Sequence, residues 1–182
     1  KRQAVDGAGE TVSYTQAPIS VDGQFGYQLG GFGVTDVLQG DPADLISLDM
    51  VEGSSSLEGN SIIAPEPLAQ EHGWRVGDTL TVAGSTGESV EATLGGLFAP
   101  SNILQSFVVS DEAAAATGAR GTGRILMIGV NNNGTVDEDQ LRANLEELVR
   151  HDIVVQVRST QDMSGEVSAM IDQMLFLSLI HI

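Results

Sequence analysis

The sequence predicts an α/β domain of the α+β kind, with a mixed sheet, crossover helices and a β-rich inserted subdomain. Strand patterns alternate with helix patterns between residues 108 and 157, as in sheets whose strands are joined by crossover helices. Residues 79–97 have the pattern of a hairpin, with the turn Gly84-Ser85-Thr86-Gly87 between two alternating stretches. The 22 glycines and the low aromatic content of 4% favour many short strands and turns with aliphatic packing.

Short apolar or alternating runs mark the individual strands. We expect strands at residues 12–15, 19–21, 34–38, 61–64, 79–82, 89–97, 107–109, 124–130 and 153–157. The run at 124–130 is apolar enough to predict a buried strand. Gly30-Gly31-Phe32-Gly33 predicts a turn rather than a phosphate-binding loop, because no Lys-Ser or Lys-Thr pair follows it.

Capping residues and periodicity mark the helices. Asp41-Pro42 predicts a short helix at residues 43–47, and Pro65 and Gly73 bound a second helix. Ser110 is expected to cap a third helix, whose first turn carries Asp111 and Glu112. A fourth is expected over residues 137–150, with a capping box from Thr135 and Glu138. Its apolar face comprises Leu141, Leu145, Leu148 and Val149.

Charge and composition exclude several classes of protein. The formal net charge is −17, with 8 Lys and Arg against 25 Asp and Glu, so there is no cationic cluster for nucleic acid or for an anionic membrane. The chain has no cysteine, which excludes a disulfide and a thiolate metal site. No apolar run reaches the length of about 20 residues that a membrane helix needs. A hydrophobic content of 41% nevertheless predicts a folded domain.

Candidate chemical groups are better explained as structural residues. His72, His151 and His181 have no ligand-spaced partners, and residues 137–139 are acidic as the first turn of a helix prefers. Ser85 lies in a turn that lacks the spacing of a nucleophile elbow, and Asn133-Gly134-Thr135 fits both a glycosylation sequon and a turn. We therefore predict no catalytic, cofactor-binding or metal-binding residues, no cofactor and no enzymatic activity.

One longer segment resembles a known family. Residues 66–82 read EPLAQEHGWRVGDTLTV and resemble a segment of the extracytoplasmic domains of FtsX-like and MacB-like ABC transporter permeases. In that family a short helix ends in Gly and leads through Val-Gly-Asp into a strand. Residues 48–53 and 60–64 resemble the stretch before this helix. Residues 137–157 resemble the closing helix–strand unit, and residues 171–175 resemble the helix that leads to a second membrane span.

The resemblance implies a non-catalytic domain on the outer side of a bacterial cytoplasmic membrane. It implies coupling of cytosolic ATP hydrolysis to export or release of a substrate, an ATP-binding subunit reached through transmembrane helices, and a permease dimer. We expect a polar N-terminal segment at residues 1–33, the extracytoplasmic domain at 34–160 and a stalk helix at 161–176. Residues 177–182 break the pattern, and we interpret them as a sequencing-adapter artefact.

Two other functions fit the same residues. One is a secreted β-rich ligand-binding or adhesion module, which would need a signal peptide in the parent gene and no flanking membrane helices. The other is a hydrolase, which would need several titratable groups converging in one pocket.

Overall fold

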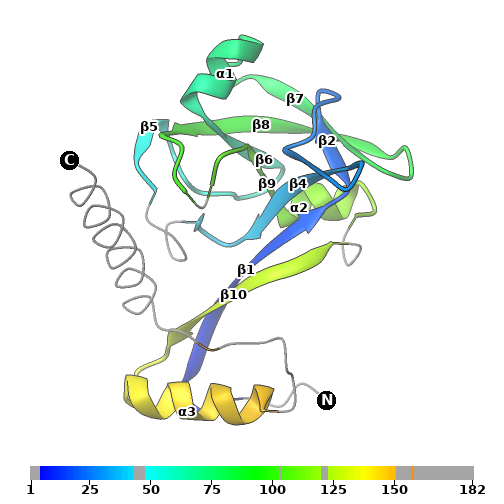
Figure 1. The fold of residues 1–182 in the computed structure, drawn as a ribbon. Helices are drawn as coiled ribbons and strands as arrows, with labels where there is room; N and C mark the ends of the chain where they lie inside the picture. The colour runs from blue at the N-terminus through cyan, green and yellow to red at the C-terminus, as the bar shows by residue number, and fades with distance from the viewer. Residues whose placement is uncertain (1–4, 43–47, 103, 120–122, 151–156, 158–182) are drawn as a thin grey trace, which may run out of the picture. The chain divides into compact units, whose positions relative to one another are not determined.

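The structure is a computed structural model that describes residues 5–42, 48–102, 104–119, 123–150 and 157. The strands are β1 (Ala8–Ala17), β2 (Ile19–Val21), β3 (Tyr27–Leu29), β4 (Phe32–Gln39), β5 (Met50–Gly53), β6 (Ser61–Pro65), β7 (Thr79–Gly84), β8 (Ser89–Phe98), β9 (Val108–Ser110) and β10 (Arg124–Asn132). The helices are α1 (Glu66–His72), α2 (Asp111–Ala116) and α3 (Glu138–Val149) (Figure 1). No helix among these residues is long and apolar enough to span a bilayer.

The predicted mixed α+β fold is confirmed. The strand order is β10-β1-β4-β9-β6-β8-β7-β2, with β3 paired to β4 and β5 paired to β8. The pairs β4–β9 and β6–β8 are parallel, and the other pairs with a described register are antiparallel. α1 lies in the connection between the parallel strands β6 and β8, as a crossover connection requires.

The chain divides into two compact units. The larger comprises Thr11–Val130, and the smaller comprises Lys1–Glu10 together with Asn131–Ile182. The larger unit is therefore an insertion in the sequence of the smaller one.

The sheet of the larger unit closes on itself. β1 pairs with β4 near one end of the strand order and β2 pairs with β7 at the other, yet only Pro18 separates β1 from β2. Proline has no backbone N–H and cannot extend a ladder, so the chain bends there and changes partners. The buried Thr35 hydroxyl on β4 donates to the Ile19 carbonyl on β2, at 2.6 Å, and joins the two ends.

Two hydrophobic clusters lie on the two faces of this ring. The inner cluster takes at least one side chain from every ring strand: Ala17, Ile19, Val21, Val37, Ile62, Ala64, Leu80, Val82, Ala92, Leu94, Leu97 and Val109. The outer cluster comprises Val12, Tyr14, Leu38, Leu57, Ile63, Phe98, Leu104 and Val108. Neighbours such as Ile62 and Ile63 belong to different clusters because side chains alternate across a strand. Strands buried on both faces explain the continuous apolar runs in the sequence.

Several local predictions are confirmed. β7 and β8 form the expected hairpin, with Thr79 opposite Thr93 and Val82 opposite Val90. α1 ends at Gly73, which adopts φ 72° in the left-handed region and returns its N–H to the Gln70 carbonyl. Ser110 caps α2, and its Oγ accepts from the Ala113 N–H at 3.2 Å.

The smaller unit packs α3 against the N-terminal segment. The Asn133 N–H donates to the Gly7 carbonyl at 2.9 Å, and Asn144 Nδ2 donates to the Asp6 carbonyl at 3.0 Å. Leu141 is buried close to Gly7, whose missing side chain leaves room for Val136.

The helix expected over residues 137–150 is confirmed as α3, but its predicted cap needs correction. The N-cap of α3 is Asp137, whose carboxylate accepts from the Gln140 N–H at 2.8 Å, whereas Thr135 bonds to Asn133. On the expected apolar face Leu141 is buried, Leu145 and Val149 are half-buried, and Leu148 is 50% exposed.

A second correction concerns residues 124–130. They form a strand, as expected, but Ile125, Leu126 and Ile128 are exposed rather than buried. The reason is topological, because β10 pairs with β1 at the end of the strand order and lies outside the closed ring. The predicted helix at 43–47 and stalk at 161–176 lie outside the described residues, as do the tail and all of the predicted strand 153–157 except residue 157.

Two adjacent glycines on β8 provide a test of the close packing around the ring. A Cβ on Gly96 would lie 2.3 Å from the Ser54 carbonyl oxygen, whereas a Cβ on Gly95 would meet nothing closer than 3.8 Å. We expect Gly96→Ala to lower the free energy of unfolding by about 1–3 kcal/mol, as overpacking does. Gly95→Ala is the matched control and should change it by less than about 1 kcal/mol. Urea unfolding followed by circular dichroism measures both, and equal losses would contradict the packing described here.

Candidate functional site

The residues singled out in the sequence have structural surroundings where the structure describes them. The His72 ring stacks on Trp74 with centroids 4.7 Å apart, and Trp74 meets Phe107 edge-on at 5.8 Å. His72 thus ends α1 and covers an aromatic contact of the core. His151 and His181 lie outside the described residues.

The other candidates are engaged in turns and caps. Asn133 Oδ1 accepts from both the N–H and the hydroxyl of Thr135, and its Nδ2 donates to the Ala8 carbonyl. Ser85 lies in the exposed turn between β7 and β8. Asp137 caps α3, while Glu138 and Asp139 lie in its first turn. The structure does not bring these residues together into one site.

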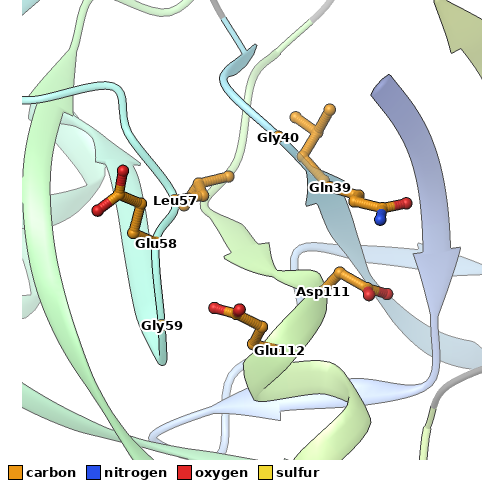
Figure 2. Close-up of a pocket in the computed structure, with 8 residues that line it drawn as sticks. Gln39, Gly40, Leu57, Glu58, Gly59, Asp111 and Glu112 are labelled. Atoms are coloured by element: carbon orange, nitrogen blue, oxygen red, sulfur yellow. The ribbon is translucent and has the colours of Figure 1, made fainter. Parts of the chain in front are cut away.

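The larger unit contains an acidic pocket. Its volume is about 280 Å³, and it is lined by Leu38, Gln39, Gly40, Leu57, Glu58, Gly59, Asp111 and Glu112. Figure 2 shows the Glu58 and Glu112 side chains extending from facing segments, with Asp111 at the start of α2. Such a lining disfavours an anionic ligand. In the part of the chain that the structure describes, no three His, Cys, Asp or Glu side chains are grouped closely enough to hold a metal ion.

The most unusual polar group of the larger unit is the carboxyl of Asp36. Asp36 lies on β4, is fully buried and occupies a position opposite Gln16 of β1. Gln16 Nε2 donates to Asp36 Oδ1 at 3.0 Å, whereas Oδ2 makes no hydrogen bond with the described residues. Removing a carboxylate from water is costly, so burial at this site favours the protonated acid.

The pKa values of the three acidic groups in this cluster are all raised. Burial raises the pKa of Asp36, and the polar groups of Gln16, Tyr14 and Tyr27 offset part of that shift by favouring the charged form. Burial and the neighbouring Asp36 charge raise the pKa of Tyr27 to about 12 and hold the pKa of Tyr14 well above its usual range. Both tyrosines are therefore hydrogen-bond donors at neutral pH and not bases.

The Asp36 cluster ties three segments together. Tyr14 and Gln16 belong to β1, Tyr27 belongs to β3, and the backbone of Gln105 and Ser106 lies beside the Tyr27 hydroxyl. Among the described residues, the polar side chains beside the Asp36 carboxyl are Gln16 and the two tyrosines. The arrangement can hold a proton and fix strands.

Comparison with known proteins finds similar chains among the solved structures. No protein-family model matches the sequence, and no curated protein matches it. A domain described as part of a permease from Porphyromonas gingivalis is 17% identical with a TM-score of 0.45, over 89% of this chain and 84% of that one. The periplasmic region of MacB from Actinobacillus actinomycetemcomitans is 16% identical with a TM-score of 0.40, over 81% and 69%.

The Asp36 cluster and the acidic pocket were not among the sequence predictions. A signal for Asp36 exists, because Asp36 lies between Val34 and Leu38 on one face of the expected strand. A charged residue in that pattern indicates either an exposed face or a buried, partnered acid. No such signal exists for the pocket, since its residues come from three separate segments.

Asp36 makes the stability of the chain depend on pH in a defined direction. A carboxyl whose pKa is raised on folding stabilises the fold below its unfolded pKa, and that contribution is lost as the pH rises through the folded pKa. Asp36→Asn keeps the acceptor for Gln16 and cannot ionise. The free energy of unfolding of Asp36→Asn, measured relative to that of the natural chain, should therefore rise as the pH goes from acidic to neutral. The expected rise is about 1.4 kcal/mol for each unit by which folding raises the pKa of Asp36.

Urea unfolding of both chains across this pH range measures the difference. Asp49→Asn removes one formal charge from an exposed position and is the matched control. A constant difference between Asp36→Asn and the natural chain, or an equal effect of Asp49→Asn, would contradict a buried acid that prefers its neutral form.

Proposed function

We propose that this chain is the non-catalytic extracytoplasmic domain of an ABC transporter permease of the FtsX/MacB type. In this proposal it lies on the outer side of a bacterial cytoplasmic membrane and couples cytosolic ATP hydrolysis to export or release of a substrate. The observation that carries the proposal is the folding of the family-like segment at residues 66–82.

That segment has the local structure that the resemblance implies. α1 is a seven-residue helix that ends at Gly73 in a left-handed conformation. Asp78 then closes the Val-Gly-Asp turn, since its carboxylate accepts from the Arg75 N–H at 2.8 Å, and β7 begins at Thr79. The Gly77 N–H and the Asp78 carbonyl both bond to Leu94 of β8, so the turn is part of the sheet. The motif is therefore structural in this chain, which agrees with a family defined by its fold and not by catalytic residues.

The order of the two units supports the same proposal. The smaller unit contains both Lys1–Glu10 and Asn131–Ile182, and the larger unit is inserted between them. At the point of insertion the Gly7 carbonyl is bonded to the Asn133 N–H, so the outgoing and returning strands lie side by side. A domain carried between two membrane helices needs this arrangement, because its two ends must return to the same surface.

The remaining parts of the proposal concern partners. A cytosolic ATP-binding subunit would act on this domain through transmembrane helices, and two permease chains would form a dimer. Residues 161–176 would be the stalk that leads to a membrane span. Their apolar positions, which include Met174 and Leu175, would pack partly on the second chain.

The location outside the membrane can be tested on the parent protein. The 182 residues contain no cysteine, so Ser85→Cys in the exposed β7–β8 turn would be the single label site in a parent gene from which any other cysteine codon is removed. In bacteria that express the parent gene, we expect a membrane-impermeant maleimide to label this residue in intact cells. Ala113→Cys, at a fully buried position of α2, should stay unlabelled until the protein is denatured.

Two results would contradict the proposal. Labelling only after the cytoplasmic membrane is permeabilised would place the domain inside the cell. Recovery of the labelled protein from the medium, without any membrane-bound form, would favour the secreted ligand-binding or adhesion module instead.

A further inference from the structure

We propose that the tip of the β3–β4 hairpin is a site that inserts into an electrically neutral lipid surface. The tip consists of Phe25, Leu29 and Phe32, whose side chains are 42%, 51% and 76% exposed. Phe32 is the most exposed large apolar side chain of the described residues. Nothing in the proposed permease function requires this contact.

The hairpin presents these side chains in a fixed geometry. Gly30 and Gly31 adopt φ 58° and 88°, as a two-residue hairpin turn with positive φ at both central positions requires. Leu29 and Phe32 are therefore direct cross-strand partners, and their side chains lie together on one face at the end of the hairpin. The Phe25 ring lies against Gly33, where a Cβ would come within 2.2 Å of the ring. Apolar side chains thus occupy both faces of the tip.

Charge indicates what kind of surface this tip can meet. Residues 23–35 contain no charged side chain, although the whole chain has a net charge of −17. A protein that binds through ion pairs would have no charged side chain to pair with in this segment. An anionic bilayer would be repelled by the rest of the molecule, while a zwitterionic bilayer would not.

The size of the tip favours lipid over a protein. A stable protein–protein interface takes about 20–30 residues from each side. The tip offers three apolar side chains on a two-stranded hairpin, which is too small for such an interface. Insertion into the boundary between headgroups and acyl chains needs only a few aromatic and aliphatic side chains.

Flotation with phosphatidylcholine vesicles tests this inference on the 182-residue chain, in the absence of any transporter component. We expect the natural chain to float with the vesicles, and Phe32→Ser and Leu29→Ser each to lower the partition coefficient by about tenfold, as loss of a buried Phe or Leu implies. Val51→Ser is the matched control, because Val51 is 50% exposed on β5 beside the charged Glu52, and it should float like the natural chain. Anionic lipid at low salt should weaken the binding.

Four outcomes would overturn the inference. They are no flotation of the natural chain, undiminished flotation of Phe32→Ser and Leu29→Ser, an equal loss with Val51→Ser, and stronger binding to anionic vesicles. Self-association that Phe32→Ser abolishes, in the absence of vesicles, would assign the tip to a second copy of the chain instead. Since the vesicles contain no permease, each of these results leaves the proposed function to be decided by the labelling experiment.

Discussion

The bend at Pro18 is the constraint on which the larger unit depends. It lets one stretch of chain pair with β4 on one side and with β7 on the other, so that the sheet has no free edge between them. The buried Thr35 hydroxyl secures the junction, since it donates to Ile19 and accepts from the Gly26 N–H at 3.1 Å. Closure explains the two-sided burial of β4, β6 and β9 and the need for small residues where segments cross. It also explains why β10, which lies outside the ring, keeps apolar side chains exposed.

Because the ring is closed, its buried polar side chains bond to neighbouring segments of the chain. Ser110 Oγ accepts from the Ala113 N–H at the start of α2 and from the Ser61 N–H on β6, so one hydroxyl serves a helix cap and a strand. Asp36 cannot reach water from its place on β4 and instead meets Gln16 and two tyrosines. In both cases the polar side chain bonds to a neighbouring strand.

The sequence predicts those elements whose signals are local. The β7–β8 hairpin, the Ser110 cap and the end of α1 at Gly73 follow from neighbouring residues, and the structure has all three. Closure of the ring does not follow, because it joins residues such as Ile19 and Gly84 that are far apart in sequence. The prediction that residues 124–130 are buried is wrong for the same reason. An apolar run indicates a strand, whereas burial depends on which strands and helices pack against it, and only the topology defines those. Asp36 was missed because its partners come from other strands.

The Asp36 cluster and the hairpin tip are connected through Tyr27. This residue begins β3, so it lies at the base of the hairpin whose far end carries Leu29 and Phe32. Its hydroxyl lies beside the Asp36 carboxyl and the backbone of Gln105 and Ser106. The base of the hairpin thus lies against the ring of strands, while Leu29 and Phe32 at its end are exposed. An apolar tip on a rigid base loses little conformational freedom when it meets another surface, which lowers the cost of binding. The ring of strands therefore provides the support that a small contact site needs.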